Sequence, residues 1–351
     1  MSHSHSAFVR NLAKAKGLTL VASAALTVRR IPRGTGFSYC HAGGSRVHNK
    51  RELARLNALA VPPAYVEVRF AADPSAHLQA IGTDAAGRLQ YRYHPAWTEV
   101  REAVKARRLA RLARALPAIK RAVVRTLASA GPSVDFAAAA VVHLVDLTAL
   151  RAGAERHARD RGTRGASTLL KSNVAVSGDA VLLEFKAKGA RTVTKEVRDA
   201  RLAKAVARLQ RLPGRRLFQY RAPDGAVHPV RAREVNSYLR EVGGRRISLK
   251  DFRTLVGSGG VLEALAAQPA GRSQRERRSQ LRSAVVEIAS ELANTPTVCR
   301  KSYVHGAVVA AFESGRLSRM RKPPRSPAKK ATALARLVTK TASETKTRQD
   351  T

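Results

Sequence analysis

Acidic residues, aromatic residues and cysteines are scarce in this chain of 351 residues. The two cysteines, Cys40 and Cys299, lie far apart in the sequence, so they form neither a disulfide framework nor the paired spacing of a zinc site. Aromatic residues make up 5% of the chain and hydrophobic residues 44%, so the core must consist mainly of alanine, leucine and valine. This composition favours helices.

Long apolar runs are also missing. No stretch approaches the roughly 18 uncharged apolar residues of a transmembrane helix. The apolar run Val21–Val28 is short and no clear cleavage pattern follows it, so we expect no signal peptide. With isolated cysteines, these absences predict a cytoplasmic protein.

Basic residues, in contrast, are abundant. The chain holds 65 Lys and Arg against 25 Asp and Glu, a formal net charge of +40. Such an excess repels itself in isolation and indicates a polyanionic partner.

The sequence predicts an α+β fold in four segments. Residues 1–30, rich in alanine and basic residues, predict a flexible basic arm. Short runs of period 2 between turn residues predict a small antiparallel β domain over 31–95, with one helix at 50–59. Residues 96–313 predict a larger domain, mainly helical, with a three-stranded meander between 173 and 195. Residues 314–351 predict a disordered basic tail.

Apolar residues at a spacing of three to four mark the helices of the larger domain. The expected ranges are 100–116, 117–130, 134–150, 195–212, 231–242, 249–257 and 273–293.

Tyr303 is the most informative single residue. It follows a long predicted helix, stands nine residues after Asn294, and has Arg300 and Lys301 as close neighbours. A phenol ordinarily has a pKa of about 10, so a nucleophilic tyrosine needs cationic neighbours. Attack on phosphorus also builds negative charge that needs preorganised donors. Taken alone, Tyr303 fits a surface or half-buried tyrosine on a basic helix better than a nucleophile.

Three cationic residues upstream complete a candidate site. Arg151 ends an apolar helix, Lys188 lies at a hairpin tip beside Gly189, and Arg253 lies near the start of a helix, whose amide dipole favours phosphate. Each has an ordinary alternative as a solvated surface residue, and Asn294 has one as a helix C-cap. Their combination suggests attack on a phosphodiester.

Five short segments, in order, resemble the signature segments of the type IB DNA topoisomerases, in particular the short bacterial and poxvirus-like members. The likeness extends over roughly residues 30–310. The segments are Leu150–Gly153, Lys188–Gly189, Lys250–Thr254, Asn294–Pro296 and Ser302–His305.

The resemblance implies a β domain and a helical catalytic domain that clamp duplex DNA as a monomer. It also implies that Tyr303 attacks the scissile phosphorus and leaves a 3′-phosphotyrosyl enzyme. Arg151, Arg253 and Asn294 would stabilise the transition state, and Lys188 would protonate the leaving 5′-oxygen. Neither ATP nor a metal ion would be needed, and supercoils of either sign would relax.

Further basic and polar residues are candidate DNA contacts. The run Gln90–Tyr93 has the composition of a strand that reads a groove. Lys186 competes with Lys188 for the role of acid, but the Lys-Gly turn favours Lys188, and Lys186 is then a backbone contact. The remaining candidates are Lys250 and four arginines of one predicted helix, Arg275, Arg277, Arg278 and Arg282.

Three departures from the family pattern affect residues beside the reacting groups. Ala154 stands where relatives usually have an amide, Leu255 where tryptophan is usual, and Gly306 where proline is common. Because all five reacting positions are present, we still expect an active enzyme, although these changes favour a slower one.

Two other functions fit part of the pattern. A tyrosine recombinase shares this chemistry, but would normally carry histidine at the position of Leu255, and the predicted β domain fits it less well. A nucleoid protein without catalysis fits the charge equally well, because phosphate binding needs only charge. The presence of Tyr303, Lys188 and both arginines favours the topoisomerase.

Overall fold

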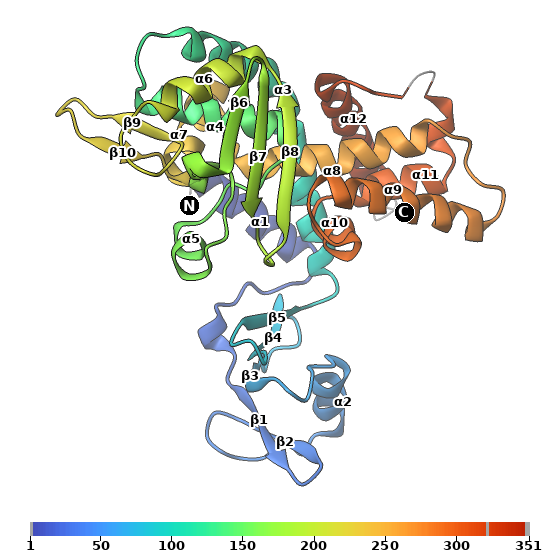
Figure 1. Cartoon of the computed structure of the whole chain (residues 1–351). Helices are drawn as coiled ribbons and strands as arrows, with labels where there is room; N and C mark the ends of the chain where they lie inside the picture. Colours follow the sequence, from blue (N-terminus) through green and yellow to red (C-terminus); the bar gives the residue numbers. More distant parts are fainter. Residues whose placement is uncertain (1–2, 321–322, 348–351) are drawn as a thin grey trace. The chain divides into compact units, whose positions relative to one another are not determined.

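A computed structural model describes residues 3–320 and 323–347. The chain divides into two compact units, Met1–Val104 and Lys105–Thr351 (Figure 1). The division falls within helix α3 (Trp97–Ala128), a few residues beyond the boundary of 95 that the sequence predicts. Among the described residues, no helix combines the length and apolar character needed to cross a membrane.

The first unit is built on a five-stranded antiparallel sheet in the order β2-β1-β3-β4-β5. Val28, Val68, Phe70 and Ala80 are buried on it together with Leu56 of the covering helix. The elements are α1 (His3–Ala15), η1 (Ser23–Ala25), β1 (Val28–Arg33), β2 (Gly36–Cys40), α2 (Lys50–Ala58), β3 (Val66–Phe70), β4 (Leu78–Thr83) and β5 (Leu89–Tyr93).

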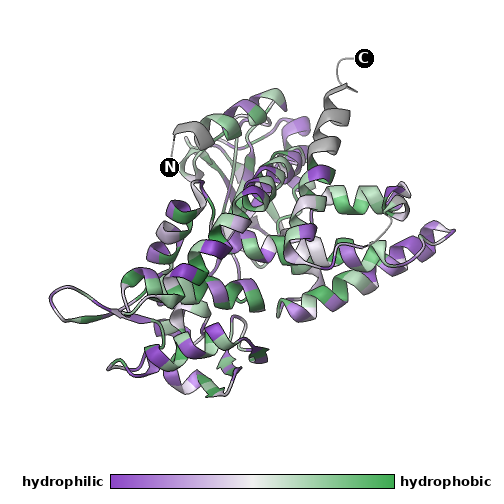
Figure 2. Cartoon of the chain, turned by 90° about the horizontal axis from the view of Figure 1, so that it is seen from above, coloured by the Kyte–Doolittle hydropathy of each residue, from purple (hydrophilic) through white to green (hydrophobic). Residues whose placement is uncertain are grey.

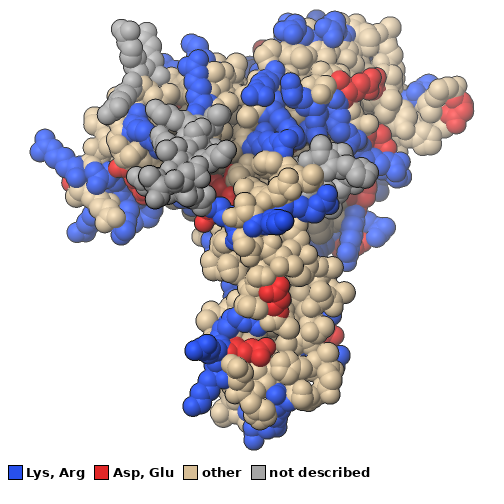
Figure 3. Space-filling view, turned by 180° about the vertical axis from the view of Figure 1, so that it is seen from behind, with Lys and Arg blue, Asp and Glu red and all other residues tan. Residues whose placement is uncertain are grey.

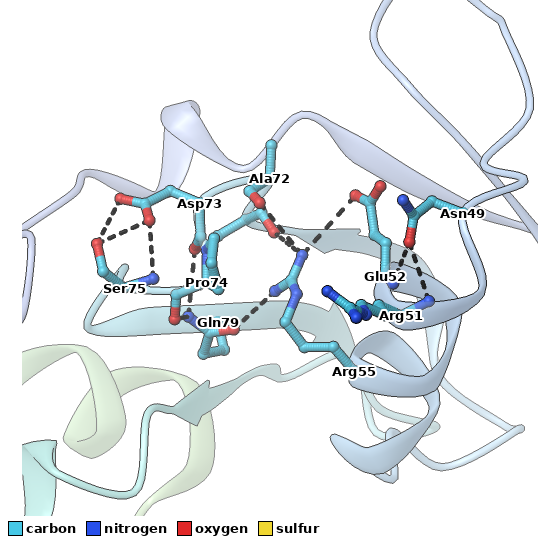
Figure 4. Close-up of polar contacts among 10 residues, drawn as sticks. Asn49, Arg51, Glu52, Arg55, Ala72, Asp73, Pro74, Ser75 and Gln79 are labelled. Atoms are coloured by element: carbon cyan, nitrogen blue, oxygen red, sulfur yellow. Dashed lines mark hydrogen bonds and ion pairs between the residues drawn. The ribbon is translucent and has the colours of Figure 1, made fainter.

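Arg55 fastens α2 to this sheet (Figure 4). Its guanidinium donates to the side chain of Gln79 at 2.8 Å and to the carbonyl of Ala71 at 2.9 Å, and Glu52 lies 3.8 Å away. Gln79 is itself buried and donates to the carbonyls of Pro74 and Ala76. Each buried polar group of this network therefore has a partner.

The prediction of a flexible arm over residues 1–30 is wrong for most of that segment. α1 packs on the first turns of α3, where Ala13, Leu18 and Val100 are buried. Leu26 is buried against a second cluster, and Val28 already belongs to β1. The burial of these apolar residues offsets the entropy of ordering the segment, but their packing partners lie far away in the sequence.

The second unit is mainly helical. Its elements are α4 (Val134–Thr148), α5 (Glu155–Arg161), η2 (Ala166–Thr168), η3 (Lys171–Asn173), β6 (Val174–Ser177), β7 (Ala180–Lys186), β8 (Thr192–Arg198), α6 (Ala200–Gln210), β9 (Gln219–Arg221), β10 (Val227–Pro229), α7 (Ala232–Gly243), α8 (Leu249–Ala266), α9 (Gln274–Glu291), α10 (Pro296–Ser302), α11 (Gly306–Glu313), η4 (Arg316–Arg319) and α12 (Pro327–Thr347).

Buried alanine, leucine and valine side chains form the core of the second unit, as the composition predicts. α8 and α4 are its most buried helices, with 13 of 18 and ten of 15 residues inside, while other helices show apolar and polar bands along their length (Figure 2). β6, β7 and β8 form the predicted three-stranded antiparallel meander. The antiparallel sheet and the mainly helical core confirm the predicted α+β fold.

The sequence also predicts a break between two helices at Pro117, and this prediction is wrong. α3 runs through Pro117 as one helix of 32 residues. Proline removes one backbone donor and disfavours a helix interior. Here Leu112, Leu116 and Ile119 are buried in the core around it, so tertiary packing overrides the local preference.

The prediction of a disordered tail over 314–351 is wrong for the described part. α12 packs on α8, with Ala331 and Leu334 buried in the core and Lys330 paired with Glu263 at 2.5 Å. Leu317 of η4 is buried as well. Residues 321–322 and 348–351 of the predicted tail lie outside the described residues.

Candidate active site

Two helix ends place Arg151 and Asn294. α4 ends at Ala149 in the left-handed region, with φ 53°, and the segment after α9 contains Ala293 with φ 47°. Alanine pays a conformational penalty in this region, which glycine does not. The two reversals direct the chain so that the guanidinium of Arg151 donates to the carbonyl of Ala293 at 3.3 Å and to the side-chain oxygen of Asn294.

Arg253 joins the same group from the first turns of α8. It is 3% exposed, and it donates to the carbonyls of Ala149 and, at 2.9 Å, Leu292. Its guanidinium carbon lies 4.9 Å from the ring centroid of Tyr303. The structure therefore brings together four of the five predicted catalytic residues, Arg151, Arg253, Asn294 and Tyr303.

Tyr303 is held by its backbone against α8. It caps α10, and its carbonyl accepts a hydrogen bond of 2.7 Å from the hydroxyl of Ser258. The same hydroxyl accepts from the backbone amide of His305 at 3.0 Å. A Cβ on Gly257 would lie 2.6 Å from Cβ of Tyr303, so only glycine allows this approach.

Two buried donors of this group have no acceptor. Among the described residues, Nε of Arg253 and Nδ2 of Asn294 find no hydrogen-bond partner. Buried polar groups are nearly always paired, and an unpaired donor carries a desolvation penalty. Because Arg253 lies over the ring of Tyr303 and Asn294 binds Arg151, both donors suit an anionic ligand that supplies the missing acceptors.

The electrostatics of the group are strongly positive. Burial, and then the neighbouring charge of Arg253, lower the pKa of Arg151, while Tyr303 acts in the opposite direction. Arg191 from the turn after β7 contributes to the same lowering. An incoming phosphate would relieve this mutual repulsion among cations.

Lys188 makes no contact with the other four predicted catalytic residues in the described structure. It is exposed in the turn between β7 and β8, where Gly189 has a φ of 85°. The turn is closed by a hydrogen bond of 2.7 Å from the amide of Ala187 to the carbonyl of Arg191. Arg191 of the same turn acts on the charge of Arg151, so the base of the hairpin is near the site. Catalytic contacts of this kind often tighten only in the complex with substrate.

A glycine loop fixes the backbone of Arg151. The carbonyl of Arg151 accepts from Ala166 at 2.8 Å, and that of Ala152 accepts from the amide and hydroxyl of Ser167 at 2.8 Å. A Cβ on Gly165 would lie 2.6 Å from the Arg151 carbonyl oxygen. The segments that contain Gly153 and Gly165 therefore touch at these two glycines, and a side chain on either would clash.

The three departures from the family pattern have local consequences. Ala154 is the N-cap of α5 and provides no side-chain hydrogen bond to the first turn. Leu255 is buried in the core of α8. Gly306 begins α11, which is capped by the ring of His305 accepting from Ala307 at 3.0 Å. None of them removes a reacting group.

The candidate run Gln90–Tyr93 is divided between the two faces of the edge strand β5. Gln90 donates to Asp84 at 2.8 Å and Arg92 donates to the carbonyl of Ala60 at 3.1 Å. On the other face, the rings of Tyr91 and Tyr93 are about half exposed and stack with centroids 6.2 Å apart. The four residues therefore do not form one contact surface.

The remaining candidates are mostly exposed. Arg275, Arg278 and Arg282 lie on one face of α9, whereas Arg277 turns to the carbonyl of Gly271 at 3.1 Å. Lys186 and Lys250 are exposed at the end of β7 and the start of α8. Lys and Arg side chains spread over the face drawn in Figure 3, with few acidic ones between them.

Sequence reasoning missed several residues that hold the group in place. They are Gly165, Lys195, Gly257 and Ser258. The run Gly257–Gly260 inside a helical pattern was a usable signal, because glycine in a helix interior often marks a close approach. Lys195 carried no such signal, since its partners are backbone carbonyls of distant segments.

Comparisons with known proteins agree with this geometry. Residues 95–323, more than half of the chain, match the family model described as eukaryotic DNA topoisomerase I, catalytic core. Residues 36–84 match that of the bacterial DNA topoisomerase IB N-terminal domain. A protein of Acanthamoeba polyphaga mimivirus named DNA topoisomerase 1B is 29% identical over 294 residues, which cover 82% of this chain and 88% of that protein.

The chain therefore belongs to the type IB DNA topoisomerase family, and the resemblance noted from its five segments is confirmed. It is an enzyme of the DNA topoisomerase class.

Proposed function

We propose that this enzyme relaxes positive and negative supercoils through transient cleavage of one DNA strand, with Tyr303 as the nucleophile. The observation that carries the proposal is a pair of buried donors without an acceptor among the described residues. One belongs to Arg253, which lies over the ring of Tyr303, and the other to Asn294, which binds Arg151. A phosphodiester offers non-bridging oxygens to both donors, and its transition state strengthens those bonds.

Each reacting group has one role in this mechanism. The Tyr303 hydroxyl gives its proton to solvent water and its oxygen forms a bond to phosphorus, while the bond from phosphorus to the 5′-oxygen breaks. Arg151 and Arg253 stabilise the non-bridging oxygens, Asn294 donates to one of them, and Lys188 gives its proton to the leaving 5′-oxygen. The products are a 3′-phosphotyrosyl enzyme and a free 5′-hydroxyl.

Religation reverses these steps and needs no ATP, because the phosphotyrosyl ester keeps the energy of the broken phosphodiester. The two arginines and the lysine supply the positive charge that a metal ion would otherwise supply. Rotation of the DNA beyond the nick, before religation, then removes supercoils of either sign.

DNA binding is distributed over both units in this proposal. We assign residues 31–95 to DNA binding and 96–313 to catalysis, with one chain clamping one duplex. Tyr91 and Tyr93 are suited to pack on sugars or bases. The phosphate contacts are Lys186, Lys250 and three arginines of α9, Arg275, Arg278 and Arg282. The charge of +40 supports nucleoid association.

The test is relaxation of a negatively supercoiled plasmid in EDTA without ATP. We expect relaxation by the wild type and none by Tyr303→Phe, with Tyr220→Phe as the control for loss of a hydroxyl in the same unit. A strand labelled on the 5′ side of the nick should become covalently attached to the wild type and to Tyr220→Phe, and not to Tyr303→Phe.

Other results would replace the proposal. If the wild type binds the plasmid but neither relaxes it nor becomes covalently attached, the result would favour a non-catalytic nucleoid protein. Covalent attachment followed by joining of strands from two duplexes would favour the recombinase. Relaxation by Tyr303→Phe would show that the nucleophile is another residue.

A further inference from the structure

The ends of α4 and α9 are joined by two successive cationic bridges. Lys195 of β8 donates from Nζ to the carbonyl of Thr148 at 2.9 Å and to that of Glu291 at 2.8 Å. Arg253 donates to the carbonyl of the next residue in each of these two segments, Ala149 after Thr148 and Leu292 after Glu291. The same two backbone ends are therefore held in register at two adjacent positions.

This arrangement suits the chemistry of helix ends. The last carbonyls of a helix have no partner within it and carry the negative end of its dipole, so cations stabilise them. After each helix the backbone also turns through an alanine in the left-handed region, Ala149 after α4 and Ala293 after α9. This conformation persists only when the surroundings enforce it. Asn294 follows Ala293 directly, and Arg151 follows Ala149 after one residue.

Lys195 is a structural cation in an unusual place. It reaches the two carbonyls from an edge strand of the meander, and its side chain is half-buried. Burial lowers the pKa of Lys195 and Arg253 lowers it further, whereas Glu291 raises it. Two of the three ammonium donors are occupied by carbonyls, which makes Lys195 a poor candidate for delivering protons to substrate.

We propose that Lys195 is a positioning residue for the reaction: by joining Thr148 to Glu291 it sets the carbonyls to which Arg253 binds. The inference rests on the proposed function, because it assumes that Arg253 stabilises the transition state. Without Lys195, the two helix ends lose one bridge, and Arg253 alone must hold them against the repulsion of the carbonyl dipoles.

The first experiment compares Lys195→Met with the wild type and with Lys204→Met. Lys204 is an exposed lysine of α6 in the same unit, so its substitution controls for the loss of one charge. At saturating protein, we expect Lys195→Met to cleave a single-site duplex on the order of 100-fold more slowly, the effect of a misplaced catalytic group. DNA affinity should match that of Lys204→Met, and Lys195→Arg should recover much of the rate.

A pair of modified substrates separates positioning from other roles. A neutral methylphosphonate at the scissile position lacks one negative oxygen for the arginines to stabilise, so the penalty of Lys195→Met should shrink on it. A sulfur in place of the 5′-oxygen leaves without a proton, so on that substrate the penalty should persist. Ratios between substrates are measured on one protein sample, so a reduced folded fraction cancels.

Three results would overturn the inference. Equal cleavage rates for Lys195→Met and Lys204→Met would mean that the bridge has no effect on catalysis. A penalty that disappears with the sulfur leaving group would make Lys195 a proton donor. An equal penalty on the methylphosphonate would make its role general stability. A wild type that fails to cleave would instead contradict the proposed function.

Discussion

Arg55 and Arg253 are both arginines that donate to backbone carbonyls, one in each unit, yet their surroundings differ. Arg55 also binds the side chain of Gln79 and has Glu52 as a nearby counter-charge. Arg253 is more deeply buried, has cations as its neighbours, and keeps Nε without an acceptor among the described residues. Among the described residues, Arg253 forms no ion pair.

The difference distinguishes a structural arginine from one prepared for a ligand. A satisfied network stabilises the fold and needs nothing further. A buried cation with a spare donor and no carboxylate is unfavourable until an anion arrives. The unsatisfied donors of the candidate active site can therefore gain hydrogen bonds when a ligand binds. Among the described residues, the first unit has no such buried donor.

Exchanging each arginine for lysine should separate the two roles most clearly. Arg253→Lys keeps the charge but loses the spare donor and the bridge to Leu292, so we expect the cleavage rate to fall by about 100- to 1,000-fold. Arg55→Lys should lower the unfolding temperature and leave the chemical step unchanged. Single-turnover cleavage and thermal unfolding measure both; equal cleavage rates for the two variants would refute the distinction.

Crowding the nucleophile should have the next largest effect. Gly257→Ala places a methyl group against Cβ and the carbonyl of Tyr303, so the tyrosine must shift and cleavage should slow by about 100-fold. Gly243→Ala is the control, because its new methyl group meets only the ends of Ile247 and Ile119 side chains at 3.3 Å and 3.5 Å. Similar cleavage by both variants would mean that Gly257 does not seat the nucleophile.

Asn294 tests whether the spare donor matters by itself. Asn294→Asp keeps an oxygen for Arg151 but loses the unpaired Nδ2, and it adds a negative charge near the phosphate, so cleavage should slow by at least about 10-fold. Asn294→Ala loses both contacts and should be slow as well. A rate for Asn294→Asp equal to the wild type would show that the donor has no role in catalysis.

The smallest expected effect lies in the first unit, at Asp84. Hydrogen bonds from Arg88, then from Gln90 and Ala86, hold the pKa of Asp84 at about 2, below its ordinary 3.8. A lowered carboxylate pKa stabilises the fold above the ordinary pKa, and this stabilisation is lost as pH falls through about 2.

Asp84→Asn should therefore lower the unfolding temperature at pH 7 by about a few degrees. The gap between variant and wild type should narrow as the pH falls from 5 towards 2. Circular dichroism melts across this range provide the measurement. A gap that widens in acid would mean that the carboxylate is not stabilised in the folded state.

Local patterns predicted much of the fold. The alternation in β3 to β5, the Gly178 turn between β6 and β7, and the spacing of apolar residues in α4 and α9 all correspond to observed elements. α12 was missed although Ala331, Leu334 and Val338 are spaced for one buried face, because the basic, proline-containing run before and at its start suggested a tail.

The sequence by itself determined the basic charge and the order of the main elements, because residue type and short-range periodicity are local properties, and it predicted which residues are candidates for the reaction. Only the tertiary structure decided how Arg253 meets Ala149, 104 residues away, and how Arg151 meets Ala293, 142 residues away. It also decided that Lys195 joins two helix ends and that Gly257 touches Tyr303. A contact with a backbone carbonyl does not depend on the type of residue that supplies it, and a glycine inside a helix indicates a close approach without identifying the partner. Packing therefore decides which segments meet.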